Sequence, residues 1–310
     1  MSNGGSSQPR PTRNDRREAA REKARLLREE QKKRDRRKKV IVQSSVIVGV
    51  VAVAGLIAFL IFQGIKPAGP GPRNMASDGI VLQGVDGVIT AVETPALQPG
   101  DDPVPTEQDQ SGDVANIVTY LDYLCPYCGQ FESTNSETMR TLVESGAATL
   151  EVHPIAILTN KSAGTQYSLR AANAAGCVAD SSPEAFFDFN EILFENQPEE
   201  GSTGLTNDQL KELAAEAGAS SQVNACIDEV RFKAWVLDST ERALSGPIPN
   251  AEIPAVTGTP TVLVNGKSYG GSLTDAAEFQ AFVTQAASES SLESTDDPSA
   301  TPTPTPTPAQ

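Results

Sequence analysis

An uncharged apolar run near the N-terminus constrains this chain more than any other feature. Residues 40–62 are 23 consecutive uncharged residues, among which Gln43, Ser44 and Ser45 are the polar members. With a rise of about 1.5 Å per residue, an α-helix of this length crosses a hydrocarbon core of about 30 Å. The sequence therefore predicts a transmembrane helix over residues 40–63.

A cleaved secretory signal is the alternative reading of this run. Such signals usually have an apolar core of about 7–15 residues behind a short basic segment, followed by a small-residue cleavage site. Here 39 residues precede the run, and its A-x-A sequence, Ala52-Val53-Ala54, lies inside it. We therefore favour an uncleaved anchor over a cleaved signal.

Charge is divided unequally about the predicted span. Residues 1–39 contain 15 Lys+Arg and 6 Asp+Glu, a net charge of +9, and the rest of the chain carries −24. The positive-inside rule makes the basic segment cytoplasmic and everything after residue 63 extracytoplasmic. Residues 16–39 lack Gly and Pro and are predicted to form a helix. We expect its cations to contact anionic lipid headgroups; binding of nucleic acid or of a protein partner is the alternative. The acidic remainder argues against a nucleic-acid partner there.

Prolines mark the boundaries of the folded part. Of the 22 prolines, seven lie within residues 67–105 and five within residues 298–308. We expect residues 64–112 to form an extracytoplasmic linker with one strand-like patch, Ile80 to Val92, that turns at Asp86-Gly87. Residues 289–310 are Ser/Glu/Asp-rich, end in a Thr-Pro repeat and are predicted to be disordered. The folded domain is expected over residues 113–288.

The order of patterns within that domain predicts an α/β fold with a helical insertion over about residues 160–245. Strands are expected at residues 116–121, 148–158, 261–264 and, after an Asn265-Gly266 hairpin turn, 267–270. Helices are expected from the end of the first strand to about residue 145, then at about residues 164–179, 183–196, 207–217, 221–245 and 275–287.

The chemistry of the chain is concentrated at Cys125-Pro126-Tyr127-Cys128. A C-x-x-C at the junction of a strand and a helix puts the first sulfur at the helix N-terminus, where free N–H groups and the helix dipole favour a thiolate. The second cysteine, one turn further on, can attack a mixed disulfide formed at the first. This pattern predicts a redox-active pair with Cys125 as the nucleophile.

A zinc site and a purely structural Cys125–Cys128 disulfide are the competing readings of this motif. Zinc sites usually take four ligands, typically from two closely spaced pairs. The other cysteines, Cys177 and Cys226, are isolated in the sequence, and the chain has one histidine. A structural disulfide across so short a loop is strained. We therefore expect redox chemistry, with no metal and no cofactor.

On the basis of these residues, the chain resembles the thioredoxin superfamily, and in particular the membrane-anchored, DsbA-like thiol oxidoreductases of bacterial envelopes. The resemblance covers about residues 79–288. It rests on the insertion and on three motifs, Asp122-Tyr123-Leu124-Cys125-Pro126-Tyr127-Cys128, Gly258-Thr259-Pro260-Thr261 and Val264-Asn265-Gly266. It implies that Pro260 is cis beside the C-x-x-C and that the Thr259 backbone pairs with substrate peptide. We also expect Pro126 and Tyr127 to contact substrate.

The chain departs from this family at two positions. Many relatives have His in the C-x-x-C dipeptide and an acidic residue six positions before the first cysteine, where this chain has Tyr127 and Thr119. Loss of the His removes one group that stabilises the thiolate. Pro-Tyr is also the glutaredoxin dipeptide, but glutaredoxins are small, lack the helical insertion and use cytosolic glutathione.

Three further residues have candidate roles. Asp122, three residues before Cys125, is expected either to relay protons during exchange or to end the strand and cap the next helix. Cys177 and Cys226 are expected to form a structural disulfide, because four cysteines in an oxidising space can pair evenly; two buried free thiols are the alternative.

These features predict a membrane-anchored, extracytoplasmic protein-disulfide oxidoreductase. Its expected partners are secreted or envelope proteins and a membrane redox protein that resets the active site. Extracytoplasmic placement favours oxidation of substrates, while an isomerase or a reductase would have the same parts and a different reduction potential. A tethered binding module with a structural Cys125–Cys128 disulfide is the non-enzymatic alternative.

Overall fold

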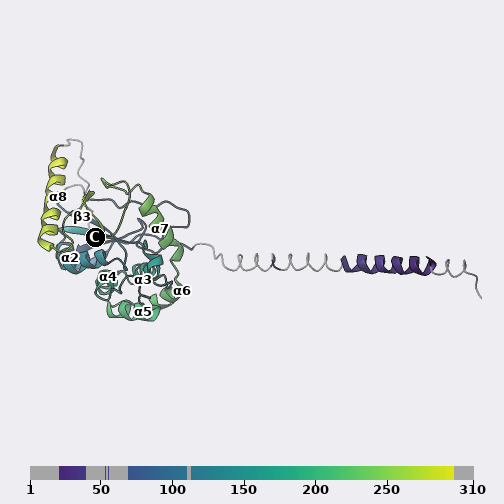
Figure 1. Ribbon diagram of the computed structural model, residues 1–310. Coiled ribbons are helices and arrows are strands. Elements are labelled where there is room, and N and C mark those ends of the chain that lie inside the picture. The colour runs from purple at the N-terminus through teal and green to yellow at the C-terminus, as the bar shows by residue number, and fades with distance from the viewer. Residues whose placement is uncertain (1–20, 40–52, 54, 56–68, 110–112, 297–310) are drawn as a thin grey trace, which may run out of the picture. The chain divides into compact units, whose positions relative to one another are not determined.

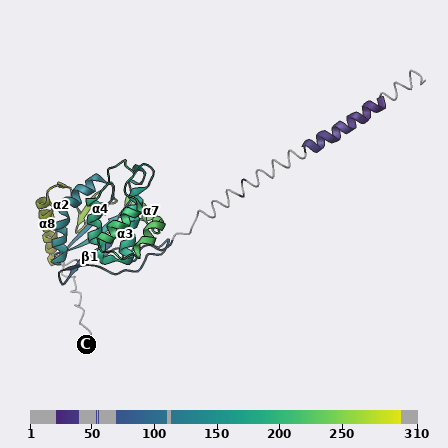
Figure 2. The same ribbon diagram turned by 90° about the horizontal axis from the view of Figure 1, so that it is seen from below.

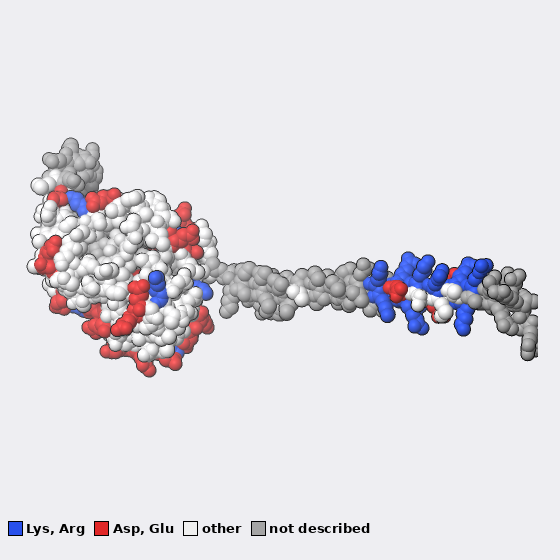
Figure 3. Space-filling model, in the orientation of Figure 1, with Lys and Arg blue, Asp and Glu red and all other residues white. Residues whose placement is uncertain are grey.

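The computed structural model describes residues 21–39, 53, 55, 69–109 and 113–296 (Figure 1). The chain divides into two units, Met1–Pro67 and Ala68–Gln310. In the first unit residues 21–39 are helical, in agreement with the predicted basic helix, and Figure 3 shows its dense cover of Lys and Arg. The predicted transmembrane segment lies outside the described residues except at positions 53 and 55. Within the described part of the chain, no helix has the length and apolar character to cross a membrane.

A six-stranded mixed sheet organises the second unit, in the order β2-β1-β4-β3-β5-β6. Its strands are β1 (Ile80–Val85), β2 (Val88–Ala91), β3 (Ala115–Leu121), β4 (Ala148–Pro154), β5 (Thr261–Val264) and β6 (Lys267–Ser268). β3 and β4 are parallel, and the other neighbouring strands are antiparallel. The sheet and its helices confirm the predicted α/β, thioredoxin-like fold.

The β1–β2 hairpin belongs to this sheet. It turns at Asp86-Gly87, where both residues have positive φ, as the sequence predicts. β1 also pairs with β4, with Leu82 opposite Leu150, and Leu82 is buried. The patch expected on an extended linker is therefore an integral edge of the sheet, because β1 pairs with β4 and buries Ile80 and Leu82 in the core.

Helices surround the sheet and fill the insertion between β4 and β5. They are α2 (Pro126–Glu144), α3 (Tyr167–Ser181), α4 (Phe186–Glu195), α5 (Asn207–Glu216), α6 (Val223–Glu229), α7 (Lys233–Ser245) and α8 (Ala276–Asp296), with short 3-10 turns at Thr159–Lys161 and Pro183–Ala185. α2 and α8 lie side by side in both ribbon views (Figures 1 and 2). The single helix predicted over residues 221–245 is two helices, because Val230 adopts a left-handed φ of 45° that ends α6.

The last helix is longer than predicted. α8 continues through Asp296, so residues 289–296 are helical and the predicted disorder of this segment is wrong. Asn265 contributes to this extension, since its Nδ2 donates to the Ala286 carbonyl at 3.2 Å and to the Ser290 hydroxyl at 3.0 Å. Ser and Glu are acceptable helix residues once such contacts fix the helix against the domain. The Thr-Pro repeat lies outside the described residues.

The central strand β3 is buried on both faces along its whole length. Ile117 and Leu121 belong to the main hydrophobic core, whereas Val118 and Tyr120 belong to a second cluster that includes Ala243 of α7. A strand packed on both faces is held firmly. The loop that follows Leu121 therefore begins from a fixed point.

Candidate active site

The C-x-x-C motif begins where β3 ends. Residues 122–125 form a turn in which the Cys125 N–H donates to the Asp122 carbonyl at 2.9 Å. Cys125 is the N-cap of α2, with extended backbone angles, and Pro126 follows in the first turn. Proline is favoured there because its missing N–H would have no helical partner in that turn. The predicted placement of Cys125 at a helix N-terminus is confirmed.

The two sulfurs of the motif have different environments. Cys125 and Cys128 are both free thiols, and Cys128 is fully buried in the core. The Cys128 thiol donates a hydrogen bond that lowers the pKa of Cys125 to about 6, against an opposing effect of burial and with help from the backbone N–H groups of Cys128 and Tyr127. Burial raises the pKa of Cys128 well above its usual value. These environments favour the thiolate at Cys125 and the protonated thiol at Cys128.

The loop before β5 lies against Cys125. The Thr259–Pro260 peptide bond is cis, and the Cys125 sulfur is 3.2 Å from the Thr259 carbonyl oxygen. The cis geometry is the one that the resemblance implied.

A groove of about 450 Å³ opens beside the Cys125 sulfur. Its lining joins three segments of the chain and consists of Cys125, Pro126, Tyr127, Gln130, Ile157, Leu158, Glu200 and Thr259. Tyr127 is 61% exposed, so its ring is available to an incoming molecule. The structure thus brings Pro126, Tyr127 and Thr259 together around Cys125, while Pro260 is not among the lining residues.

Asp122 orders the loops around the motif. Its carboxylate accepts hydrogen bonds from the Leu124 N–H at 2.9 Å, the Leu158 N–H at 2.8 Å and the Ser168 hydroxyl at 2.6 Å. Burial raises the pKa of Asp122, although these hydrogen bonds oppose that effect. Its carboxylate links the loop after β3 to Leu158 and to Ser168 of α3. It does not cap α2, whose N-cap is Cys125 with no side-chain cap hydrogen bond, so the expected capping role is not seen. A proton relay stays a prediction.

Glu132 is a buried acid that the sequence analysis missed. It lies on α2 one turn after Cys128 and is 2% exposed. Burial raises the pKa of Glu132 to about 7, although the Ser136 hydroxyl and the Asn190 amide donate to its Oε2 at 3.2 and 3.1 Å. The spacing C-x-x-C-x-x-x-E could have signalled it, because residues four apart share a helix face.

The remaining cysteines form a disulfide, and the single histidine has structural contacts. Cys177 of α3 and Cys226 of α6 are bonded, fully buried and 5.8 Å apart between Cα atoms. The expected pairing is therefore confirmed.

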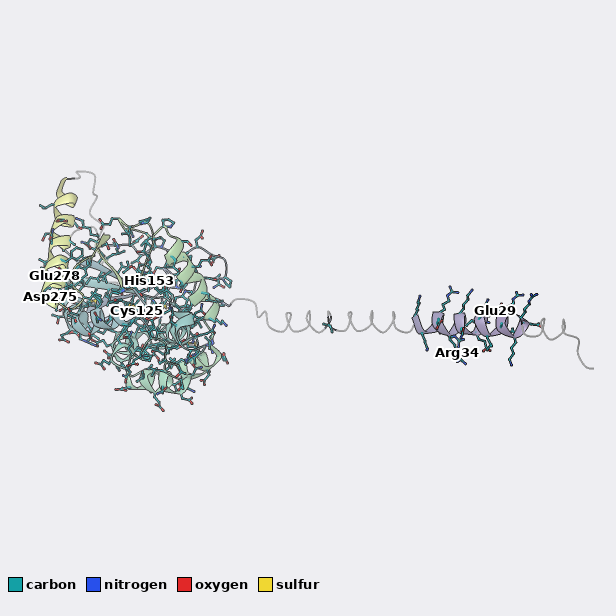
Figure 4. The ribbon with its side chains drawn as sticks, in the orientation of Figure 1. Glu29, Arg34, Cys125, His153, Asp275 and Glu278 are labelled. Carbon is teal, nitrogen blue, oxygen red and sulfur yellow. A yellow bond between two sulfur atoms is a disulfide. The ribbon has the colours of Figure 1, made fainter. Side chains whose placement is uncertain are left out.

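His153 (Figure 4) lies in β4, stacks on Tyr120 and has its Nε2 3.1 Å from Glu151. Among the described residues, no cluster of His, Cys, Asp and Glu is arranged to hold a metal ion.

A central sheet, a dithiol at a helix N-terminus and a cis-proline loop beside it define a thioredoxin-like redox protein. The sequence profile of the family described as Thioredoxin matches residues 114–285, and the chain belongs to that family. This membership agrees with the predicted enzyme class, protein-disulfide oxidoreductase.

Several solved structures and curated proteins have sequences similar to that of this chain. The chain is 30% identical to the reduced form of the disulfide bond oxidoreductase DsbG from Mycobacterium tuberculosis, over 74% of this chain and 97% of that one, with a TM-score of 0.49. It is 32% identical to oxidised DsbA from the same organism, over 69% and 98% of the two chains, with a TM-score of 0.49. It is also 28% identical over 187 residues to the Na(+)/H(+) antiporter NhaA 1 of Salinispora arenicola, which is 58% of this chain and 24% of that protein. The chain spans about a quarter or less of the length of the curated relatives it matches.

Proposed function

We propose that this chain is a protein-disulfide oxidoreductase that oxidises thiols of extracytoplasmic proteins through Cys125 and Cys128. The observation that carries the proposal is the asymmetry of the dithiol. Cys125 is at the N-terminus of α2 with a pKa lowered to about 6, whereas the Cys128 thiol is buried with a raised pKa. A low pKa suits Cys125 as the nucleophile or leaving group of the exchange. A raised pKa suits Cys128 as the resolving thiol, which stays protonated until it attacks the mixed disulfide.

The proposed reaction begins with the Cys125–Cys128 disulfide. A substrate thiolate attacks the Cys125 sulfur, the bond to Cys128 breaks, and the Cys128 sulfur leaves as a thiolate that takes up a proton. A second substrate thiolate then attacks the substrate sulfur of the mixed disulfide and releases the Cys125 thiolate. The substrate loses two electrons and gains a disulfide, while the enzyme gains two electrons and is left as a dithiol. The low pKa of Cys125 makes it the better leaving group in the second step.

Substrate contact is proposed at the groove beside Cys125. Pro126, Tyr127 and the backbone of Thr259 line it, so an extended segment of an unfolded or partly folded protein can lie against the sulfur. Pro260 holds this loop in its cis form next to the dithiol. The substrates that fit the predicted topology are secreted or envelope proteins, and a membrane redox partner would return the dithiol to the disulfide.

Placement outside the cytoplasm rests on the sequence of residues 1–63. The basic segment over residues 1–39 and the apolar run after it match an uncleaved, single-pass anchor with a cytoplasmic N-terminus. An oxidising compartment is where a donor of disulfides has substrates. An isomerase or a reductase would use the same two cysteines at a lower reduction potential.

The test measures exchange and its direction with the chain from residue 69 onward and with the full chain in membranes. Oxidation of a reduced two-cysteine peptide should be fast with wild type and lost in Cys125→Ser, while the Cys177–Cys226 bridge stays intact in both. Cys128→Ser mixed with the oxidised peptide should accumulate a mixed disulfide, because the Cys125 thiolate attacks the peptide disulfide, one peptide thiolate leaves, and no second enzyme thiol resolves the product. A redox equilibrium with glutathione gives the potential, and a value near that of thioredoxin, about −270 mV, would contradict the oxidase assignment. Absence of exchange in wild type would leave only the binding-module reading.

A further inference from the structure

The side chain of Gln197 reaches the active-site loop from the helical insertion. Gln197 follows the C-terminus of α4, two residues beyond Glu195. Its Nε2 donates to the Cys125 carbonyl at 2.9 Å and to the Tyr123 carbonyl at 3.2 Å. Two carbonyls of the loop that presents the reactive sulfur are thus held by one amide, which is far away in sequence.

The Cys125 carbonyl is also the first acceptor of α2. It receives the Gly129 N–H at 3.1 Å in addition to the Gln197 amide. Two donors on one carbonyl fix the plane of the Cys125–Pro126 peptide, and that plane sets the direction of the N–H groups that follow. Pro126 has no N–H, so the backbone donors to the sulfur are the N–H groups of Tyr127 and Cys128, which add to the larger effect of the Cys128 thiol.

Gly129 makes room for this contact. A Cβ atom built at Gly129 would lie 2.3 Å from Gln197 Oε1, far inside van der Waals contact. Gly129 is helical and has no positive φ, so its backbone does not require glycine. The close approach of the Gln197 amide is the reason that a glycine suits this position.

We propose that Gln197 is a positioning residue for disulfide exchange: its amide holds the Cys125–Pro126 peptide so that the Tyr127 and Cys128 N–H groups point at the Cys125 sulfur. This inference rests on the proposed role of Cys125. A thiolate exists in the dithiol state and not in the disulfide state, so the clamp stabilises the reduced form more than the oxidised form. Through it, the helical insertion tunes the redox equilibrium of a dithiol that belongs to the thioredoxin core.

The test compares Gln197→Leu, which removes the donor and leaves a side chain one atom shorter, with Asn196→Leu. Asn196 is a matched control because it is exposed and its Nδ2 donates to the Ile192 carbonyl of its own helix. We expect Gln197→Leu to raise the pKa of Cys125 by about one unit from about 6, which at pH 7 shifts the equilibrium with glutathione about fivefold toward the disulfide. That shift corresponds to a potential about 20 mV lower. Asn196→Leu should leave both quantities unchanged.

A double-mutant cycle isolates the contact itself. Gly129→Ala should lower the potential in the wild-type background, because the new methyl displaces the amide. In the Gln197→Ala background the same substitution should have little effect, since the displaced group is gone. Additive effects of the two changes would contradict the clamp.

A purely structural role for Gln197 gives a different result. Loss of a structural contact destabilises the reduced and oxidised states equally, so the melting temperatures of both fall while the potential stays at its wild-type value. That outcome, in an enzyme whose wild type exchanges disulfides, would overturn the inference. Failure of wild type to exchange disulfides at all would instead refute the proposed function.

Discussion

The Cys177–Cys226 bridge offers a stability prediction whose size follows from the structure. It joins α3 to α6, both partners are fully buried, and 49 residues separate them. In the chain-entropy description, closing a loop of about 50 residues restricts the unfolded state by about 4 kcal/mol at 25 °C. The double variant Cys177→Ala/Cys226→Ala should lose about that free energy of unfolding. For a domain of this size the melting temperature should fall by roughly 8–16 °C.

The assay is urea unfolding of the non-reduced protein, with wild type and the double variant measured side by side. Removing the cross-link expands the unfolded chain, so the dependence of the unfolding free energy on urea should become steeper. Peptide oxidation should persist at temperatures where both proteins are folded, because the bridge does not touch the Cys125 groove. Cys125→Ser serves as the inactive reference.

Lost packing must be separated from the lost cross-link. Cys177→Val/Cys226→Ala restores part of the volume that the double Ala variant removes, so it should recover little of the stability if the cross-link dominates. A loss below about 1 kcal/mol with unchanged urea dependence would refute the entropic reasoning. Near-complete recovery by the Val-containing variant would show that packing, not chain restriction, is the cause.

Three other outcomes are expected. Alkylation of the reduced protein should begin at Cys125 with a midpoint near pH 6, and Cys128→Ala, which removes the donor, should move that midpoint upward because the Cys128 hydrogen bond is the main cause of the low pKa; a midpoint unmoved by this substitution would contradict that cause. Burial raises the pKa of Glu132 to about 7, so its contribution to the free energy of unfolding is fully present below its unfolded pKa and is lost as pH rises through about 7. The free energy of unfolding of Glu132→Gln should therefore exceed that of wild type by up to roughly 3 kcal/mol at pH 8 and by little at pH 4. Stabilities of the two proteins that vary equally with pH would argue against this cause. Protease added to spheroplasts should digest the second unit and spare about the first 39 residues, whereas a secreted form that starts after residue 63 would mean a cleaved signal.

The local signals in the sequence were sufficient for the order of the elements and for the reactive residue. The junction of a β-branched run with C-x-x-C puts Cys125 at a helix N-terminus, and Asn265-Gly266 makes the β5–β6 turn, with positive φ at both residues. The helical insertion followed from the order of patterns along the chain, and the cis Thr259–Pro260 bond from the family resemblance. These features depend on residues within a few positions of one another or on an ordered set of motifs, both of which can be seen in the printed chain.

Contacts between distant segments were decided by the tertiary structure alone. The hairpin at residues 80–91 has a visible turn, but its pairing with β4 depends on where the edge of the sheet lies. Glu132 looks like a solvated helix residue until packing buries it, which raises its pKa. Gln197 meets the Cys125 carbonyl only because the insertion folds back onto α2, 72 residues away in sequence. Periodicity and turn signals reflect short-range backbone preferences, whereas burial and hydrogen bonds across the fold depend on where whole elements pack.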